Sequence, residues 1–319
     1  MTILVTGGTG FVGSNIIQKL VARNKPVRAM VRPGSADKVK LRLGKLGSQV
    51  EVVEGDVRDR KSLPRLMKDV SSVIHTVAVS IEKGDATYEE VNYQGTINIV
   101  DAAEDAGVQR FIFISQNGAD SSIKYRFLQS KGKAQDYVHN SKLAATSLRP
   151  SAIFGPQDEF FNTFARLLRL TPLVFPLVGG GKAEFQPVHV SDVAAAAVRS
   201  LEDPTTIGLK LDLGGPEVLT LGEIERRVIK ALDTSRLLFP APVWLLRPAV
   251  VVMQRVLAGS PVTTSLLDLL AVPNTVPNNA LVSHFKMEPI AFSGDNISYL
   301  KKATAGEALR KFFTGKVTS

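Results

Sequence analysis

A glycine-rich turn near the amino terminus constrains the fold of this chain more than any other feature. The stretch MTILVTGGTGFVGS (residues 1–14) places this turn after a short apolar run and before a helix-like sequence. A strand, a tight glycine turn and a helix in this order form a cradle for the pyrophosphate of a dinucleotide. The first N–H groups of the helix and its positive dipole end attract the anion, and glycine allows a close backbone approach.

The glycines of the turn fit two spacings. Gly8, Gly10 and Gly13 match G-x-G-x-x-G. Gly7 with the same Gly10 and Gly13 matches G-x-x-G-x-x-G, and the run TGGTGFVG resembles the extended and atypical branches of the short-chain dehydrogenase/reductase superfamily. The alternative is a strand–helix turn that binds no ligand. The residues expected to contact the cofactor here are Thr6, Gly7, Gly8, Thr9, Gly10, Phe11, Val12 and Gly13.

The composition narrows the classes of protein to consider. The 319 residues suffice for one large α/β domain, alone or with a smaller appendage. The chain has no cysteine, which excludes disulfides and thiolate sites, and its four scattered histidines predict no metal site. The net charge of +9 suits an anionic cofactor, protein or membrane surface. Its basic residues are spread out, without interleaved aromatic residues, so we expect no nucleic-acid partner.

The sequence also carries expectations about location. It begins directly on a core strand, so we expect no signal or transit peptide. An uninterrupted apolar run of about 18 residues, as a membrane-spanning helix requires, does not occur. We therefore expect a cytoplasmic protein, with peripheral contact at the inner face of a membrane left open.

The end of the second predicted strand, residues 25–31, bears on cofactor choice. An NAD-preferring site usually has an acidic residue there, which binds the ribose 2′-hydroxyl. This chain has Arg32 instead, and Lys38 and Lys40 follow. Because a guanidinium pairs well with a 2′-phosphate, the sequence favours NADP(H) over NAD(H). The alternative is that Arg32 is a solvated loop residue.

The resemblance implies further cofactor contacts after the third and fourth strands, residues 49–53 and 72–77. In the superfamily an aspartate after the third strand contacts the adenine, and Asp56 stands there with Val57 beside it. The fourth strand leads into the segment that passes beneath the cofactor. The residues of this segment expected to line the site are Thr76, Val77 and Ala78. His75 stands at the end of this strand. Its structural interpretation is that the ring hydrogen-bonds neighbouring backbone groups and takes no part in the site.

The next elements complete the predicted sheet. Residues 89–106 have helical periodicity, and Asn92 with the following Gly95 and Thr96 matches the superfamily's N-x-x-G-T element. There the asparagine usually ties the helix to the central strands. The fifth strand is predicted at residues 110–115. Strands that alternate with helices imply right-handed crossovers and a parallel sheet, so we expect a Rossmann-type, doubly wound α/β fold.

Active members of the superfamily carry a serine or threonine just past the fifth strand, then a tyrosine and, four residues later, a lysine. The lysine charge lowers the pKa of the tyrosine, and the spacing of four places both on one helical face. Lys131 matches the lysine, but the residue four before it is Phe127, which cannot transfer a proton. Ser115 or Gln116 stands at the serine position.

Three interpretations remain open for this site. In the first, proton transfer by tyrosine is lost and the site only binds the nucleotide. In the second, Tyr125 acts from a distorted helix start, although six residues, about 600° of rotation, separate it from Lys131. In the third, hydride transfer proceeds with Lys131 or water as the proton donor. Lys131 can hold the ribose hydroxyls in all three.

The second half of the chain adds a more specific resemblance. In ATSLRPSAIFGP (residues 145–156), Pro150 and Ile153 stand where the superfamily backs the nicotinamide. With FQPVHVSDVA (residues 185–194), this segment resembles the nucleotide-binding accessory subunit of respiratory complex I and its bacterial relatives. The resemblance covers roughly residues 1–230. Farther along, Thr220 and Glu223 predict a capping box that opens a helix.

The carboxyl-terminal part is expected to form a small, mostly helical lobe, residues 236–319, next to a nucleotide-binding domain, residues 1–235, with which it shares late strands. Its apolar segment, residues 236–258, holds the only tryptophan, Trp244, with flanking arginines and prolines. Such a segment suits a membrane interface, a protein partner or the chain's own core. A final amphipathic helix is predicted at residues 299–313.

Three functions follow from these observations and from the resemblance. The first is a peripheral accessory or assembly component of the respiratory NADH:quinone oxidoreductase, with NADP(H) in a structural or regulatory role. The second is an NAD(P)H-dependent reductase or epimerase for a lipophilic substrate such as a quinone or isoprenoid. The third is a regulator that senses the nucleotide. Phe127 favours the first and third, and the apolar segment favours the first and second.

Overall fold

The computed structural model describes residues 2–257, 260, 262–264, 267, 270 and 273–314. Residue 1, which begins the glycine-turn stretch, residue 258 of the apolar segment and the end of the predicted lobe, residues 315–319, lie outside this part. The chain forms two compact units. Unit 1 comprises Met1–Pro150, Val190–Leu213 and Asn278–Glu288, and unit 2 comprises Ser151–His189, Gly214–Pro277 and Pro289–Ser319. This division is discontinuous, because each unit takes in three separate stretches of the chain.

Unit 1 is built on a seven-stranded sheet whose described strand pairs are all parallel. The strand order is β11-β6-β5-β4-β1-β2-β3. The strands are β1 (Thr2–Thr6), β2 (Val27–Val31), β3 (Val50–Glu54), β4 (Val70–His75), β5 (Arg110–Ile114), β6 (Ala144–Pro150) and β11 (Lys210–Leu213). The order reverses between β1 and β4, and ligands bind at such a reversal in open α/β sheets. The fold therefore confirms the Rossmann-type architecture.

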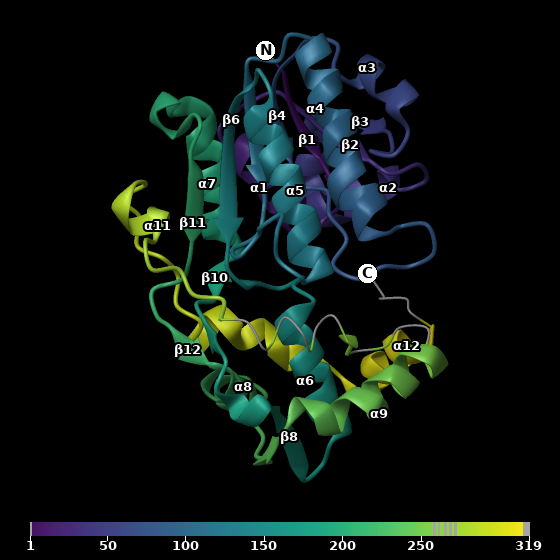
Figure 1. The fold of residues 1–319 in the computed structure, drawn as a ribbon, viewed down its shortest axis with the longest axis vertical. Helices are drawn as coiled ribbons and strands as arrows, with labels where there is room; N and C mark the ends of the chain where they lie inside the picture. Colours follow the sequence, from purple (N-terminus) through teal and green to yellow (C-terminus); the bar gives the residue numbers. More distant parts are fainter. Residues whose placement is uncertain are drawn as a thin grey trace. The chain divides into compact units, whose positions relative to one another are not determined.

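Helices cover both faces of this sheet, because parallel strands bury apolar side chains on each side. In Figure 1, α4 and α5 lie in front of the strands and α1 and α7 lie behind. The longer helices are α1 (Phe11–Val21), α2 (Ala36–Leu43), α4 (Gly95–Asp105), α5 (Arg126–Asn140) and α7 (Val190–Glu202). The short ones are α3 (Leu63–Leu66), α11 (Ala280–Ser283), η1 (Gly44–Gln49), η2 (Arg60–Ser62) and η5 (Pro204–Thr206). All five residues of β5 are buried, as a central strand requires.

The helix predicted at residues 89–106 is not uniform. Its first part is a π-helical turn, η3 (Tyr88–Gln94), which runs directly into α4. Thr87 caps the turn by accepting from the amide of Glu90 at 3.1 Å. The Asn92 side chain in this turn bonds both the amide and the carbonyl of Val79, at 2.8 and 3.1 Å, and donates to the Ser130 hydroxyl at 3.2 Å. Asn92 therefore ties the turn to the segment after β4 and to α5.

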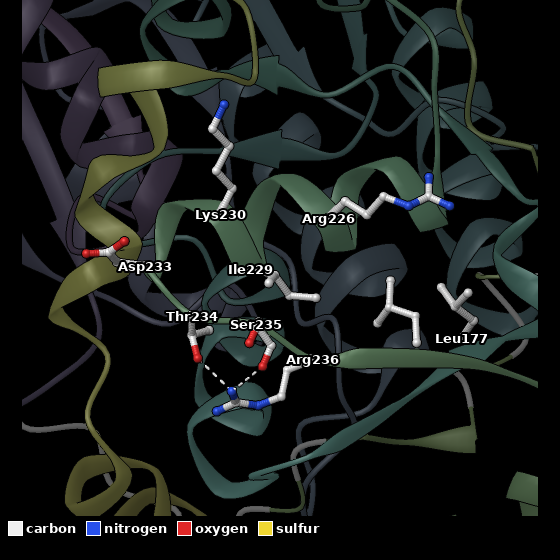
Figure 2. A pocket seen from close by; sticks show the side chains of 9 residues that line it. Leu177, Arg226, Ile229, Lys230, Asp233, Thr234, Ser235 and Arg236 are labelled. Carbon is white, nitrogen blue, oxygen red and sulfur yellow. Dashed lines mark hydrogen bonds between the residues drawn. The ribbon is translucent and has the colours of Figure 1, made fainter.

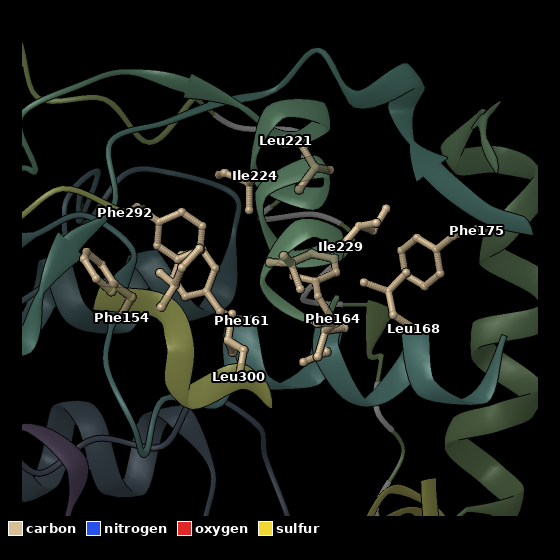
Figure 3. Packing of buried hydrophobic residues seen from close by; sticks show 14 of the residues in the cluster. Phe154, Phe161, Phe164, Leu168, Phe175, Leu221, Ile224, Ile229, Phe292 and Leu300 are labelled. Atoms are coloured by element: carbon tan, nitrogen blue, oxygen red, sulfur yellow. The ribbon is translucent and has the colours of Figure 1, made fainter. Parts of the chain in front are cut away.

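Unit 2 has its own aromatic core, shown in Figure 3. Phe154, Phe161 and Phe292 pack with ring centroids between 4.5 and 6.3 Å apart. The helices are α6 (Phe160–Leu170), α8 (Leu221–Ala231), α9 (Val243–Val256), α12 (Ala305–Thr314), η4 (Gly179–Gly181) and η6 (Gly294–Lys302). The strand pairs are β7 (Ile153–Phe154) with β10 (Val188–His189), β9 (Glu184–Phe185) with β12 (Leu219–Thr220), and β8 (Val174–Val178) with β13 (Leu237–Ala241).

Two helix starts in unit 2 show how the sequence places these elements. The predicted capping box at Thr220 and Glu223 is confirmed. The single helix predicted at residues 299–313 is wrong, because η6 ends at Lys302 and Thr304 accepts from the Glu307 amide at 3.2 Å just before α12. Thr304 thus begins a new helix within the periodic pattern. None of the described helices combines the length and apolar character needed to cross a membrane.

Candidate functional site

The glycine turn between β1 and α1 has a geometry that requires glycine. Gly7 has φ +73°, and its carbonyl accepts from the Gly10 amide at 2.8 Å. A β-carbon on Gly13 would lie 2.3 Å from that same carbonyl oxygen. One on Gly8 would lie 2.9 Å from the Ala29 β-carbon of β2. Only glycine fits at Gly8 and Gly13, because a side chain would clash with the turn or with β2. Without those side chains, a ligand can approach the backbone of the turn closely.

The start of α1 is prepared for an anion. Gly10 precedes the helix, no side chain caps it, and its first turn contains no acidic residue. The first N–H groups of a helix have no partner within the helix, and they carry the positive end of its dipole. The turn residues Thr9, Phe11 and Val12 are half-buried and Gly10 is exposed, so this helix start is accessible. A pyrophosphate fits such a site.

Under the turn, Thr6 belongs to a buried network and not to an exposed surface. Its hydroxyl lies 2.7 Å from Nδ1 of His75, and Nε2 of His75 lies 3.2 Å from the Thr96 hydroxyl. The His75 ring stacks on Phe113. Burial, and to a lesser extent the charge of Lys131, lower the pKa of His75 to about 3, so this ring stays neutral. The histidine is structural, but its partners are side-chain hydroxyls rather than the expected backbone groups.

The segment after β4 closes the other side of the turn. The Thr76 hydroxyl donates to the Thr6 carbonyl at 2.6 Å. A β-carbon on Gly7 would lie 2.7 Å from that hydroxyl oxygen of Thr76. Val77 is half-buried and Ala78 is exposed. The structure thus brings Thr76 and Val77 against the glycine turn, at the point where the strand order reverses.

The predicted adenine end lies beyond β2 and β3. Arg32 is exposed and directly follows β2. Asp56 accepts from Nη2 of Arg58 at 2.7 Å and from Nε at 3.0 Å, and this pairing lowers the pKa of the Asp56 carboxyl. Val57 is buried and its carbonyl accepts from the Asn98 side chain at 2.8 Å. Arg58 also donates to Asp85 at 2.8 Å, so two carboxylates share its charge, and Arg32 supplies the exposed cation near Asp56.

Lys131 of α5 is buried beside the end of β5. Its ammonium donates to the carbonyl of Ile114 at 2.7 Å and lies 4.5 Å from the centroid of the Phe113 ring. Burial lowers its pKa to about 7. The neighbouring Ser115 hydroxyl is also buried and has no hydrogen-bond partner within the described part of the chain. A buried cation with one acceptor, beside an unsatisfied hydroxyl, suits a polar ligand group, because such groups are costly to leave unpaired.

The tyrosines do not replace the missing phenol. Tyr125 precedes the first residue of α5, and among the described residues no hydrogen bond joins it to Lys131. The Tyr137 hydroxyl donates to Asp101 at 2.7 Å, and this bond raises the pKa of Tyr137 to about 12. Phe127 packs edge-on against Tyr88, with ring centroids 5.6 Å apart. The position of the usual tyrosine is therefore part of an aromatic contact.

Tyr88 and its surroundings were not predicted from the sequence. The Tyr88 hydroxyl donates to the carbonyl of Ser80 at 2.9 Å. Both terminal nitrogens of Arg126 donate to the Glu82 carboxylate, at 2.8 and 2.9 Å, and Glu82 also accepts from the Tyr88 amide. These bonds fasten the loop after β4 to the start of α5. Local sequence patterns do not predict the Glu82–Arg126 pair, because the two residues are 44 positions apart.

The last two predicted contacts fall in different units. Pro150 ends β6 in unit 1, and its carbonyl accepts from the Asn117 amide at 2.9 Å. Ile153 belongs to β7 in unit 2, where it pairs with Val188 of β10. No group of three or more His, Asp or Glu residues in the described part of the chain is arranged to hold a metal ion.

A dinucleotide fits the residues of unit 1 on three observations. The glycine turn leaves no room for side chains, the α1 start is uncapped, and the buried Ser115 hydroxyl is unsatisfied. Fold and site together define a Rossmann-type NAD(P)-binding protein. The chain belongs to the NAD(P)H-binding family, whose model matches residues 7–204. Its resemblance to the atypical and extended short-chain dehydrogenase/reductase superfamily is confirmed.

Two relatives are named as a subunit of NADH dehydrogenase [ubiquinone]. The chain is 35% identical over 225 residues to NADH dehydrogenase [ubiquinone] 1 alpha subcomplex subunit 9, mitochondrial, of Arabidopsis thaliana, covering 69% of this chain and 55% of that protein. It is 30% identical over 243 residues to the Mus musculus protein of the same name, covering 76% of this chain and 64% of that protein. The chain thus matches less than two thirds of the length of both relatives.

Solved structures show the same fold. A Thermus thermophilus UDP-glucose 4-epimerase in complex with NAD is 25% identical, with a TM-score of 0.62, over 76% of this chain and 86% of that one. The structure of gox2253 is 24% identical, with a TM-score of 0.70, over 95% of this chain and 96% of that one. At this low sequence identity, the likeness to gox2253 shows only that the two chains share a fold.

Proposed function

We propose that this chain holds NADP(H) as a structural or regulatory cofactor and does not turn it over, as an accessory component of a respiratory NADH:quinone oxidoreductase. The observation that carries the proposal is the combination of a complete glycine cradle with Phe127 four residues before Lys131. Dinucleotide binding uses the cradle, whereas proton transfer would use the missing phenol.

Each end of the dinucleotide has residues suited to it. The turn from Gly7 to Gly13 and the start of α1 would bind the pyrophosphate. Arg32 would pair with a 2′-phosphate, and Asp56 with Val57 would lie by the adenine. The residues of unit 1 proposed for the nicotinamide riboside end are Thr76, Val77, Ala78, Ser115, Lys131 and Pro150. When bound, the nicotinamide supplies a hydride donor or acceptor.

The buried polar groups would hold the ribose. The Lys131 ammonium uses one proton for the Ile114 carbonyl, which leaves donors for ribose hydroxyls, and the Ser115 hydroxyl offers a further partner. Phe127 supplies apolar surface where a phenol would otherwise face a substrate. The His75 ring, already bonded to Thr6 and Thr96, is neutral and committed to the structure.

The names of the relatives support the respiratory assignment. Proteins of Arabidopsis thaliana, Mus musculus and Rattus norvegicus that match most of this chain are named as subunits of NADH dehydrogenase [ubiquinone]. On this proposal the protein is cytoplasmic and sits peripherally at the inner face of the membrane, next to its respiratory partner. The positive net charge is consistent with that place.

One observation favours a second candidate function. Burial places the pKa of Lys131 at about 7, where an amine can exchange a proton at neutral pH. An NAD(P)H-dependent reductase or epimerase acting on a lipophilic substrate would use Lys131 in this way. Tyr125 could serve that function only if the start of α5 rearranged, since it lies before the first helical residue.

A turnover assay separates these two functions. NADPH oxidation is followed with soluble quinones and enones for the native chain, for Lys131→Ala and for the matched control Lys133→Ala, whose side chain is partly exposed on the same helix. The holding function predicts no oxidation above the rate without protein in all three samples. Oxidation that Lys131→Ala abolishes and Lys133→Ala preserves would establish the reductase instead.

A further inference from the structure

A row of buried side chains crosses the sheet of unit 1 at the ends of its central strands. Thr6 of β1, His75 of β4 and Phe113 of β5 are register partners on neighbouring strands. The Thr6 hydroxyl lies 2.7 Å from Nδ1 of His75, whose ring stacks on Phe113 with centroids 5.8 Å apart. The Lys131 ammonium lies 4.5 Å from the centroid of that phenylalanine ring. The row therefore runs from the strand end before the glycine turn to the lysine proposed for the ribose.

The hydrogen bonds of His75 require one particular placement of the protons. The single hydroxyl proton of Thr96 is donated to the Asn92 carbonyl at 2.6 Å. The Thr96 oxygen therefore accepts from Nε2 of His75 at 3.2 Å, and the neutral ring carries its proton on Nε2. Nδ1 must then accept from the Thr6 hydroxyl, which itself accepts from the Thr76 amide at 3.2 Å. One ring nitrogen thus holds β1 and the other holds α4.

The same bonds continue from α4 to α5, the helix that carries Lys131. The side-chain amide of Asn92 donates to the Ser130 hydroxyl at 3.2 Å. Ser130 donates in turn to the Phe127 carbonyl at 2.7 Å, and Lys131 follows it directly. The five residues joined in this way form the polar chain: Thr6, His75, Thr96, Asn92 and Ser130. All five are buried, at 3% exposure or less, so any effect they have on a ligand passes through neighbouring residues.

We propose that His75 and Thr96 are positioning residues of the nucleotide site, because the polar chain fixes the glycine turn and Lys131 relative to each other. The inference rests on the dinucleotide binding proposed above and adds the groups that hold its two ends in register. The glycine turn would bind the pyrophosphate at one end of the polar chain, and Lys131 the nicotinamide ribose at the other. Groups already held in place lose less freedom when a ligand binds, so a dinucleotide gains affinity by contacting both ends.

Two ligands distinguish this role from a purely structural one. NADP⁺ would contact both ends of the polar chain, whereas adenosine 2′,5′-bisphosphate lacks the nicotinamide riboside and would contact only the end at the glycine turn. A loss of folded protein lowers both apparent affinities by the same factor, so the ratio of the two affinities isolates the positioning role. Calorimetric titration of the nucleotide-free native chain and its variants measures this ratio.

Thr96→Val removes one hydroxyl from the polar chain and keeps the shape of the side chain. The strand end before the glycine turn keeps both of its bonds to Thr76, so affinity for the bisphosphate should change less than about twofold. NADP⁺ should bind about tenfold more weakly, because the link toward Lys131 is broken. Thr96→Ser, which keeps the hydroxyl, should keep the native ratio.

The matched control for the lost hydroxyl lies in unit 2. The Thr234 hydroxyl accepts from Nη1 of Arg236 at 2.6 Å, as Figure 2 shows. Thr234→Val makes the same chemical change as Thr96→Val and breaks a side-chain hydrogen bond outside the polar chain. It should leave the affinity ratio at its native value.

A double variant tests whether His75 acts through Thr96. His75→Phe keeps an aromatic ring beside Phe113 but removes both hydrogen bonds of the imidazole, so the affinity ratio should fall about tenfold or more. Adding Thr96→Val to this variant should lower the ratio little further, because both changes break the same chain of bonds.

The native chain supplies a measurement that needs no change to the polar chain. Its sequence has four histidines, so ¹⁵N NMR of the rings gives few signals, and substitution of the other three in turn assigns those of His75. We expect a neutral His75 ring with its proton on Nε2. A proton on Nδ1 would overturn the polar chain.

The outcomes separate this inference from the proposed function. A native protein that binds neither NADP⁺ nor the bisphosphate contradicts dinucleotide binding itself. Native binding of both, with an unchanged ratio in Thr96→Val or additive losses in the double variant, overturns the positioning role alone. An equal fall of the ratio in Thr234→Val would also overturn it, because the loss of any hydroxyl would then have the same effect.

Discussion

The carbonyl oxygen of Gly7 occupies the space next to Gly13, so that a β-carbon added to Gly13 would lie 2.3 Å from it. No heavy atom of a folded protein tolerates that approach without displacement. Gly7 directly follows the strand β1, and Gly13 lies in the first turn of α1. Their contact fixes the distance between the strand end and the helix start, where a pyrophosphate would bind.

Gly13→Ala should therefore impair nucleotide binding. Displacement of the Gly7 turn would remove hydrogen bonds to a charged phosphate, and affinity should fall about tenfold or more. Titration of nucleotide-free protein by calorimetry measures this change. Gly306→Ala is the matched control, because an added β-carbon there meets no atom within 4 Å. Equal affinity of Gly13→Ala and the native chain would contradict the assignment of the cradle.

Arg32→Glu should change cofactor preference. The reversed charge would repel a 2′-phosphate but leave the uncharged 2′-hydroxyl of NAD(H) tolerated, so NADPH affinity should fall about ten- to hundredfold and NADH affinity much less. Competitive binding of both nucleotides measures the ratio. Lys68→Glu, an exposed change of the same charge, should leave the ratio as it is. Equal weakening of both nucleotides would refute the NADP(H) assignment.

The buried Lys131 predicts a pH dependence of stability. Its pKa is about 7 in the folded chain and 10.5 for an ordinary lysine side chain, as in the unfolded chain. Between pH 7 and 10.5 the unfolded chain therefore binds this proton and the folded chain largely does not. The cost of burying the charge is therefore present in full below pH 7 and disappears as pH rises toward 10.5. Relative to Lys131→Met, the native chain should gain about 1.4 kcal/mol of unfolding free energy per pH unit in this window.

Urea unfolding of the nucleotide-free native chain and of Lys131→Met, at a series of pH values across this window, measures that difference. Comparison with the variant cancels the contributions of other titrating groups, such as Glu225 and Asp158, whose raised pKa values act in the opposite direction. Parallel stability curves for the two proteins would show that Lys131 is not buried as a charge.

Arg110→Met should destabilise unit 1. The Arg110 guanidinium donates to the carbonyl of Ser200 at 2.8 Å and to the hydroxyls of Thr146 and Thr206 at 2.5 and 2.6 Å. Its removal leaves these buried acceptors unsatisfied, at a cost of about 3 kcal/mol of unfolding free energy. Arg60→Met, which breaks an exposed ion pair with Asp101, should cost less than about 0.5 kcal/mol. Denaturant midpoints of both variants compare these costs.

The sequence predicted local elements well and distant contacts poorly. The five amino-terminal strands lie within about two residues of their predicted ranges, because each has a clear apolar run between turn residues. Arg110 could be read only as the first residue of a strand, since its partner Ser200 is 90 positions away. Periodicity alone predicted a single helix across η6 and α12. The helical periodicity of the sequence continues past Thr304, although a new helix begins there in the structure.

The candidate site shows the same division. The glycine spacing predicted the glycine turn, and Phe127 predicted that the usual tyrosine four residues before Lys131 is absent. Both predictions rest on local patterns at fixed offsets. The low pKa of His75 and the contact of Tyr88 with Phe127 depend on burial and on neighbours from other elements. Such properties arise from the packed fold, so no window of sequence contains them.

Above all, we propose that the chain holds a dinucleotide without turning it over. The most direct test is the identity, amount and redox state of the nucleotide that co-purifies with the native chain, determined by mass spectrometry and absorbance after denaturation. We predict stoichiometric NADP(H), with the reduced form persisting in the presence of quinones. Protein that carries no nucleotide, or whose bound NADPH is consumed when a quinone is added, would contradict the claim.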